Sequence, residues 1–200
     1  MAKNTIVYIF VFVFFIGNNC TGYGQSYLAH TDTIRGRVIS YAKQQVGKAT
    51  ENGRNNNPLI TIWNERAGVN RRSPYCASFV FYSYVFSGFV PPIRNPATAA
   101  SWFINKKNIV WTHEDLGGNK LLYNKLKPGM VLGYKFVSGR ISHISILLKY
   151  DARDGSVYAY DANTSNKQTA IKVVREGDNV YYTKRRLSQV SIISDPLRND

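Results

Sequence analysis

Cysteine and histidine are scarce in this sequence. Its 200 residues include two cysteines, Cys20 and Cys76, and three histidines, His30, His113 and His143. Potential ligands this few and this scattered exclude a zinc finger or a similar metal centre, so we expect no metal ion and no other cofactor. A glycine-rich phosphate-binding loop and internal repeats are also missing, and the length suits one domain with a sizeable core.

Acidic side chains are few as well. Twelve Asp and Glu stand against 26 Lys and Arg, which gives a formal net charge of +14. A surface this basic attracts polyanions. Because the chain has no basic helix with the patterning that reads bases, we expect no nucleic acid partner and consider anionic cell-wall polymers and membrane surfaces instead. A basic, solvated surface without a specific partner is the simpler interpretation.

The apolar run Ile6–Ile16 is too short to cross a bilayer, which takes about 20 helical residues. It follows Lys3 and has the length of the hydrophobic part of a secretory signal. Small residues in Gly22–Gly24 suit signal cleavage, so we expect residues 1–24 to be a signal peptide and residues 25–200 to form a single exported domain. The expected location is the periplasm or the cell surface, with no stable transmembrane segment after processing.

Cys20 allows a second interpretation, in which the protein is a lipoprotein anchored through that residue. Gly17–Asn19 before it makes a poor lipidation motif, so we favour cleavage. Cleavage leaves Cys76 as the one thiol of the mature chain, which then has no partner for an internal disulfide. Exported proteins usually contain paired cysteines or none, so a lone thiol indicates a reactive residue.

Apolar spacing predicts helices in the first half of the chain and strands in the second. The expected helices, the first capped by Asp32 or Thr33, are Thr33–Lys48, Leu59–Ala67, Tyr75–Phe86 and Pro96–Phe103. The expected strands are Met130–Val137, Ser142–Tyr150, Ser156–Asp161, Thr169–Glu176 and Val180–Ile193. Ile104–Tyr123 has a mixed pattern that predicts neither. This order indicates an α+β domain whose N-terminal helices pack on a C-terminal antiparallel sheet of about five strands.

Cys76 follows Ser73–Tyr75, a segment with Pro74 that suits the start of a helix. In the first turn of a helix, the partial positive charge favours a thiolate, and free backbone N–H groups can bind an oxyanion. A packed core thiol is the alternative, since cysteine is among the most buried residue types.

A thiolate nucleophile needs a base, and His143 is the histidine best placed to face a helix packed on the sheet. Asp161 and Asn163 share one face of the next expected strand, from which either can orient the imidazole. The alternatives are a structural histidine and a simple turn at Asp161–Thr164. A cysteine at a helix start, a histidine on a strand and an acceptor on the next strand are more specific together than each is alone.

Five segments resemble the CHAP family of cysteine, histidine-dependent amidohydrolases and peptidases. They are Pro74–Val80, Ser142–Ile146, Asp161–Thr164, Arg175–Tyr181 followed by Arg185–Arg186, and the loop Glu51–Asn56. The resemblance implies a papain-like fold and thiol hydrolysis of amide bonds in peptidoglycan. It assigns Cys76 as nucleophile, His143 as base and Asp161 or Asn163 as orienting residue. The chain departs from the family pattern at Asp161, where Glu is usual, and at two serines that replace glycines beside the histidine, Ser142 and Ser145.

Further candidates concern the oxyanion and the substrate. The backbone N–H of Cys76 is one expected oxyanion donor, with Tyr75 as a candidate for the second. Glu51 and Trp102 are candidates for substrate binding; core packing is the alternative for Tyr75 and for all three tryptophans. We expect the basic run Lys184–Arg186 to form a solvated strand edge, with contact to anionic wall polymer as the alternative.

The sequence thus predicts a monomeric, exported peptidoglycan amidase or endopeptidase. Two other functions compete with it. One is a catalytically silent wall-binding module that kept the fold, and the other is a thiol amidase or acyltransferase that acts on a substrate outside the wall.

Overall fold

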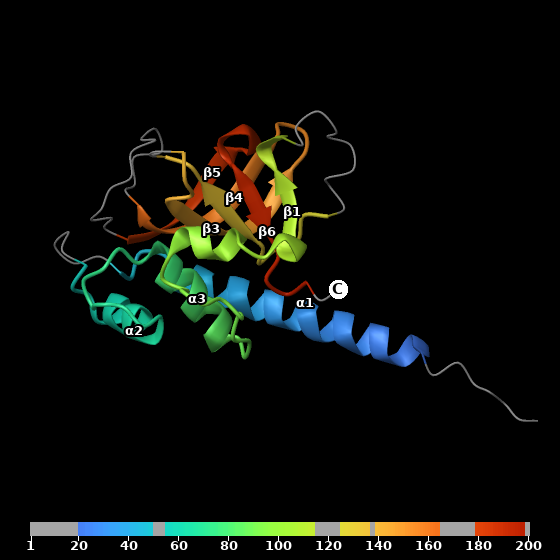
Figure 1. The fold of residues 1–200 in the computed structure, drawn as a ribbon, viewed down its shortest axis with the longest axis horizontal. Helices are drawn as coiled ribbons and strands as arrows, with labels where there is room; N and C mark the ends of the chain where they lie inside the picture. Colours follow the sequence, from blue (N-terminus) through green and yellow to red (C-terminus); the bar gives the residue numbers. More distant parts are fainter. Residues whose placement is uncertain (1–19, 50–54, 115–124, 137–138, 165–178, 199–200) are drawn as a thin grey trace, which may run out of the picture.

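The structure is a computed structural model that describes residues 20–49, 55–114, 125–136, 139–164 and 179–198 (Figure 1). Three predictions fall outside the described residues. They concern the apolar run Ile6–Ile16, the substrate candidate Glu51 and the expected strand Thr169–Glu176.

Among the described residues, three α-helices precede the sheet: α1 (Cys20–Gln45), α2 (Pro58–Arg66) and α3 (Cys76–Phe86). Helices α2 and α3 lie where the apolar spacing predicts them. The Asn57 side chain caps α2 by accepting a 2.8 Å hydrogen bond from the backbone N–H of Leu59, and Pro58 occupies the first turn. Helix α1 begins well before the expected start at Thr33, and its 26 residues contain no proline, which would interrupt a helix. None of the described helices is long and apolar enough to span a membrane.

The segment after α3 forms less helix than predicted. Only Ala99–Phe103 of the expected helix Pro96–Phe103 is helical, as the short 3-10 helix η1. A second 3-10 turn, η2 (Lys106–Asn108), leads directly into the first strand. Ile104–Tyr123, which the sequence left unassigned, therefore contains a strand.

Six strands form one antiparallel sheet in the described part of the chain, so the helices-then-sheet order of an α+β domain is confirmed. The strands are β1 (Ile109–Thr112), β2 (Val131–Tyr134), β3 (His143–Asp151), β4 (Ser156–Thr164), β5 (Asn179–Arg186) and β6 (Ile192–Ser194). Their order across the sheet is β1-β6-β2-β3-β4-β5. These six strands are not the five expected ones: Val180–Ile193 divides into β5 and β6 around the 3-10 turn Leu187–Gln189, β1 comes from a segment without a predicted strand, and the expected strand Thr169–Glu176 is not among the described residues.

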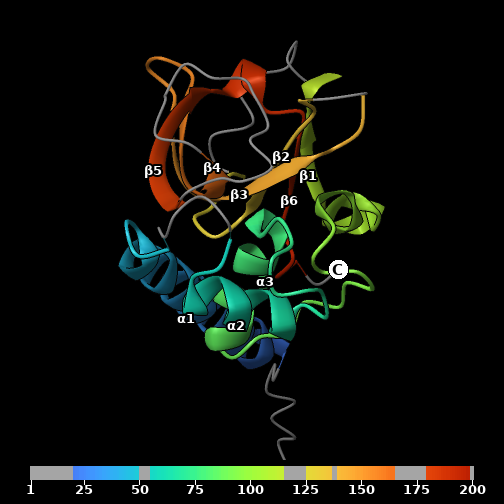
Figure 2. The ribbon, with the colours of Figure 1, turned by 90° about the vertical axis from the view of Figure 1, so that its left-hand side faces the viewer.

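The helices cover one face of the sheet, which curves above them (Figures 1 and 2). Within the described part of the chain, the alternation of side chains along the strands gives two apolar clusters. The first joins the helices to the sheet and includes Phe79 of α3 with Ile144 and Ile146 of β3. The second contains Leu132 and Leu147 among its buried residues.

A buried ion pair ties α1 to the segment that follows β6. Arg35 Nη2 donates to both carboxylate oxygens of Asp195, at 2.8 and 2.6 Å. The Tyr84 hydroxyl of α3 also donates to the backbone carbonyl of Gly129, just before β2. These polar contacts hold α1 and α3 at defined positions relative to the sheet.

Candidate active site

Cys76 is the first residue of α3, and 7% of its surface is exposed. Tyr75 is the N-cap residue, and its carbonyl accepts the first helical hydrogen bond from the N–H of Phe79 at 2.8 Å. The N–H groups of the first turn of a helix have no partner inside the helix. One of them, that of Ala77, helps to lower the pKa of the Cys76 thiol. The predicted position of the thiol at a helix start is therefore confirmed.

A buried asparagine holds the loop that delivers the thiol. Asn64 of α2 donates from Nδ2 to the backbone carbonyls of Arg71 and Ser73, at 3.0 and 2.9 Å. Asn55 donates from its own Nδ2 to the carbonyls of Arg72 and Ser73, at 3.4 and 3.5 Å. These two side chains fix the path of the chain immediately before α3. Sequence reasoning missed Asn64, because an asparagine inside a short helix gives no signal of a long-range role.

His143 begins β3 and contacts the thiol at the start of α3. The imidazole and the thiol lie close enough for each to shift the pKa of the other, His143 lowering that of Cys76 and Cys76 raising that of His143. The other side of the ring is held by Asp161 of β4, whose Oδ1 lies 2.5 Å from Nε2. Because Nε2 is engaged by the carboxylate, Nδ1 is the ring nitrogen left for the thiol.

Asp161 is completely buried, and its second oxygen is also occupied. Oδ2 accepts hydrogen bonds from Arg185 Nη2 at 2.9 Å, Arg185 Nε at 3.3 Å and Thr183 Oγ1 at 3.2 Å, both residues belonging to β5. The guanidinium carbon of Arg185 lies 5.4 Å from the ring centre of Tyr134 and 5.9 Å from that of Phe136. The same two rings flank His143, with centroid distances of 5.8 and 5.7 Å. The result is a small, largely buried polar cluster bounded by aromatic rings.

The charges in this cluster favour a thiolate. Burial alone would raise the pKa of Cys76, but the charge and hydrogen bond of His143 and the N–H groups of Ile144 and Ala77 lower it below its usual value. Burial alone would lower the pKa of His143, whereas the charges of Asp161 and Cys76 raise it well above its usual value. Burial would raise the pKa of Asp161, yet His143 and Arg185 hold it well below its usual range. A thiolate beside an imidazolium is a nucleophile next to its proton donor.

The structure also places the other predicted site residues. Asn163 lies two residues beyond Asp161 on β4, buried and with a left-handed backbone (φ 58°). Tyr75 is fully buried, with its ring centre 5.8 Å from that of Trp63. Trp102 is buried, and its Nε1 donates to the carbonyl of Pro96 at 2.9 Å. For both aromatic residues, these positions favour the packing interpretation.

Arg185 is a site residue that sequence reasoning missed. The run Lys184–Arg186 was expected to be a solvated edge, and Lys184 and Arg186 are indeed exposed. Strand alternation turns the middle residue to the opposite face, where it meets Asp161. That alternation was the available signal, and the strongly basic composition obscured it.

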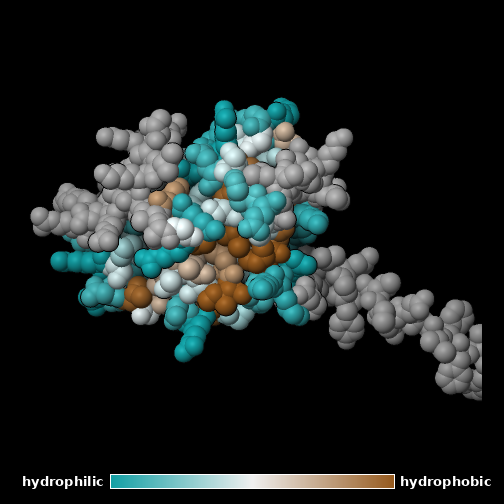
Figure 3. All heavy atoms as spheres, turned by 45° about the horizontal axis from the view of Figure 1, so that its top comes forward, coloured by the Kyte–Doolittle hydropathy of each residue, from teal (hydrophilic) through white to brown (hydrophobic). Residues whose placement is uncertain are grey.

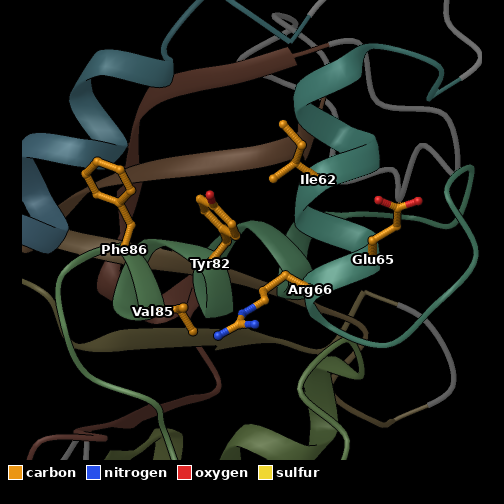
Figure 4. A pocket seen from close by; sticks show the side chains of 6 residues that line it. All are labelled: Ile62, Glu65, Arg66, Tyr82, Val85 and Phe86. Carbon is orange, nitrogen blue, oxygen red and sulfur yellow. The ribbon is translucent and has the colours of Figure 1, made fainter.

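A groove of about 560 Å³ lies between α2 and α3 (Figure 4). It is lined by Ile62, Glu65 and Arg66 of α2 and by Tyr82, Val85 and Phe86 of α3. These α3 residues belong to the second half of the helix, whereas Cys76 begins it. The groove is therefore separate from the cysteine–histidine contact.

Among the described residues, no three His, Cys, Asp or Glu side chains gather as metal ligands. Comparison of the chain with protein-family models, with curated proteins and with solved structures gives no match.

Proposed function

We propose that this chain is an exported thiol hydrolase that cleaves amide bonds of peptidoglycan and has a papain-like fold. One observation carries the proposal. Cys76 in the first turn of a helix contacts His143, and His143 is hydrogen-bonded through its other nitrogen to the buried carboxylate of Asp161. A nucleophile, a base and an orienting acceptor in this order form the arrangement of a catalytic triad.

Each residue has a role in the proposed acyl transfer. The Cys76 thiolate attacks the amide carbonyl, and N–H groups of the first turn of α3 stabilise the resulting oxyanion. His143 gives its proton to the leaving amine as the C–N bond breaks, which leaves a thioester on Cys76. A water molecule, deprotonated by His143, then hydrolyses the thioester and restores the thiol. Asp161 keeps the imidazole oriented throughout.

Two sequence features support peptidoglycan as the substrate. Residues 1–24 resemble a signal peptide, which would bring the enzyme to the wall. The net charge of +14 favours contact with an anionic wall. The alternative substrate class is an amide or acyl donor outside the wall, which the same thiol chemistry would accept.

The test is digestion of purified peptidoglycan, with the released fragments identified by mass spectrometry. We expect the wild-type protein to release fragments with new amine and carboxyl ends, and Cys76→Ala and His143→Ala to release none. His113→Ala is the matched control. His113 is exposed and directly follows β1, the edge strand that β6 and β2 separate from β3. Equal release by wild type and Cys76→Ala contradicts the proposal. Wall binding without release favours the silent binding module instead.

A further inference from the structure

The two oxygens of Asp161 serve different partners. Oδ1 meets His143, and Oδ2 meets Arg185 and Thr183. The side chain of Asp161 is 0% exposed and that of Arg185 is 14% exposed, so both charges have little access to water. Removing a carboxylate from water is costly unless a counter-charge or hydrogen bonds compensate.

Five elements contribute the ionisable groups that surround this carboxylate among the described residues. They are Cys76 of α3, Tyr134 of β2, His143 of β3, Asp161 itself on β4 and Arg185 of β5. Burial raises the pKa of Tyr134, which keeps its hydroxyl neutral. Moving a proton from Cys76 to His143 leaves their summed charge at zero. Arg185 is therefore the charge that balances Asp161 in both protonation states of the pair.

The guanidinium is held firmly enough to act as a fixed charge. It donates to Oδ2 from both Nε and Nη2, and it lies over the rings of Tyr134 and Phe136. A planar, always charged fork of this kind is suited to a buried carboxylate. The neighbouring cations Lys184 and Arg186 lie on the exposed side of β5.

We propose that Arg185 is a positioning residue of the candidate active site, which keeps Asp161 ionised and aligned on His143 so that Cys76 is held as a thiolate. This inference rests on the proposed role of Cys76 as nucleophile, but not on the identity of the substrate. Without Arg185, the buried carboxylate would take up a proton. His143 would then lose the charge that stabilises its imidazolium, and the thiolate would lose its own counter-ion.

The experiment measures the rate of alkylation of Cys76 by iodoacetamide across pH, in the expected exported domain, residues 25–200, where Cys76 is the one cysteine, and in variants of it. We expect the pH midpoint of alkylation to rise by about one unit or more in Arg185→Met, which is about a tenfold loss of rate below the midpoint. Arg185→Lys keeps the positive charge but loses the two-pronged hydrogen bonding of the guanidinium. Its midpoint should lie between those of the wild type and Arg185→Met. Arg186→Met removes an exposed charge one residue away and should leave the midpoint unchanged.

A double-variant comparison separates this role from a general loss of structure. In an Asp161→Asn background, Arg185→Met should shift the midpoint no further, because the arginine acts through that carboxylate. Circular dichroism identifies variants that fold, and Arg185→Lys carries the test if Arg185→Met does not fold. An alkylation midpoint that does not change in a folded Arg185 variant overturns the inference. So does an Arg185→Met shift that is as large in the Asp161→Asn background as in the wild type.

Failure of the proposed function gives a different result. If the wild type leaves peptidoglycan intact but the midpoint depends on Arg185 as described, the substrate assignment is wrong and the role of Arg185 is supported.

Discussion

Two opposite influences act on the protonation of His143. Its burial favours the neutral ring, whereas the charges of Asp161 and Cys76 favour the imidazolium, and the charges prevail. The thiol experiences the reverse, because burial opposes its ionisation and His143 promotes it. The pair therefore gains its reactive form from mutual contact, and substitution at one member changes the other.

A pH profile of the proposed hydrolysis tests this coupling at the residue scale. The acid limb follows the lowered pKa of Cys76 and the alkaline limb follows the raised pKa of His143, so the wild type should have a broad optimum. Asp161→Asn removes the charge that raises the pKa of His143, so the alkaline limb should move to lower pH. The thiolate then loses its imidazolium, so the acid limb should move to higher pH. Measuring kcat/KM from pH 4 to 10 on a soluble wall fragment checks both shifts.

The control for this prediction is Asp151→Asn. Asp151 lies on β3 and forms an ion pair with Arg153, whose side chain is exposed. This variant should leave both limbs in place. Limbs that do not move in Asp161→Asn contradict the role of Asp161.

At the residue scale, candidate site residues can be selected from the sequence when their chemical type is rare. Cys76 and His143 stood out because thiols and imidazoles are few, and the structure brings them together with Asp161. Arg185 did not stand out, since it is one of 26 basic residues. A residue type that is abundant on the surface reveals a buried role only through its contacts.

At the scale of elements, the pair of Arg35 and Asp195 connects α1 with the segment after β6. Arg35→Leu leaves the carboxylate of Asp195 buried without its partner. We expect the free energy of unfolding to fall by about 3–5 kcal/mol, as is typical when one member of a buried ion pair is removed. Urea denaturation followed by circular dichroism measures the change.

Glu65→Gln is the comparison for this experiment, because it breaks the exposed ion pair with Arg71. Exposed pairs contribute about 0–1 kcal/mol, so its effect should be small. If both substitutions lower the free energy of unfolding equally, the pair of Arg35 and Asp195 does not stabilise the position of α1.

Two glycines provide a second test at the scale of elements. A Cβ on Gly133 of β2 would lie 2.6 Å from Phe103 Cζ and 2.8 Å from Ile192 Cγ2, so η1 and β6 leave no room for it. Gly133→Ala should therefore destabilise the protein by about 1–3 kcal/mol. Gly36 of α1 is exposed, and a Cβ there would have no neighbouring atom within 4 Å, so Gly36→Ala should stabilise by about 0.5–1 kcal/mol. Thermal denaturation of both variants measures the opposite shifts, and a stable Gly133→Ala protein contradicts the close approach.

Local pattern was enough to predict α2 and α3, since each has a clear start and an apolar face or core. Local pattern does not predict β1, which has only four residues. This strand pairs with β6, about 80 residues later in the chain, from Ile109↔Ser194 to Thr112↔Ile192. Short strands of this kind are defined by a distant partner, and a window of neighbouring residues contains no signal for them.

The whole molecule carries a net positive charge. On the face shown in Figure 3, hydrophilic residues surround a hydrophobic area. With a net charge of +14, binding to an anionic wall polymer should depend strongly on salt. We expect affinity for polyglycerol phosphate to fall by at least about tenfold between about 0.05 and 0.5 M NaCl. Sedimentation or fluorescence titration measures it.

Cys76→Ala should bind this polymer as well as the wild type, because Cys76 is buried and its replacement leaves the basic surface unchanged. Neutral dextran serves as the control polymer. Affinity that is independent of salt, or equal for dextran, contradicts an electrostatic contact with the wall.

The strand order also has a consequence for biosynthesis. β6 lies between β1 and β2, and Ser194 is the register partner of both Ile109 and Val131. A nascent chain that ends before Ile192 therefore presents two unpaired strand edges, which are sites for aggregation or chaperone binding. Although α3 and its thiol emerge early, the sheet closes only after the ribosome has translated the codons for β6.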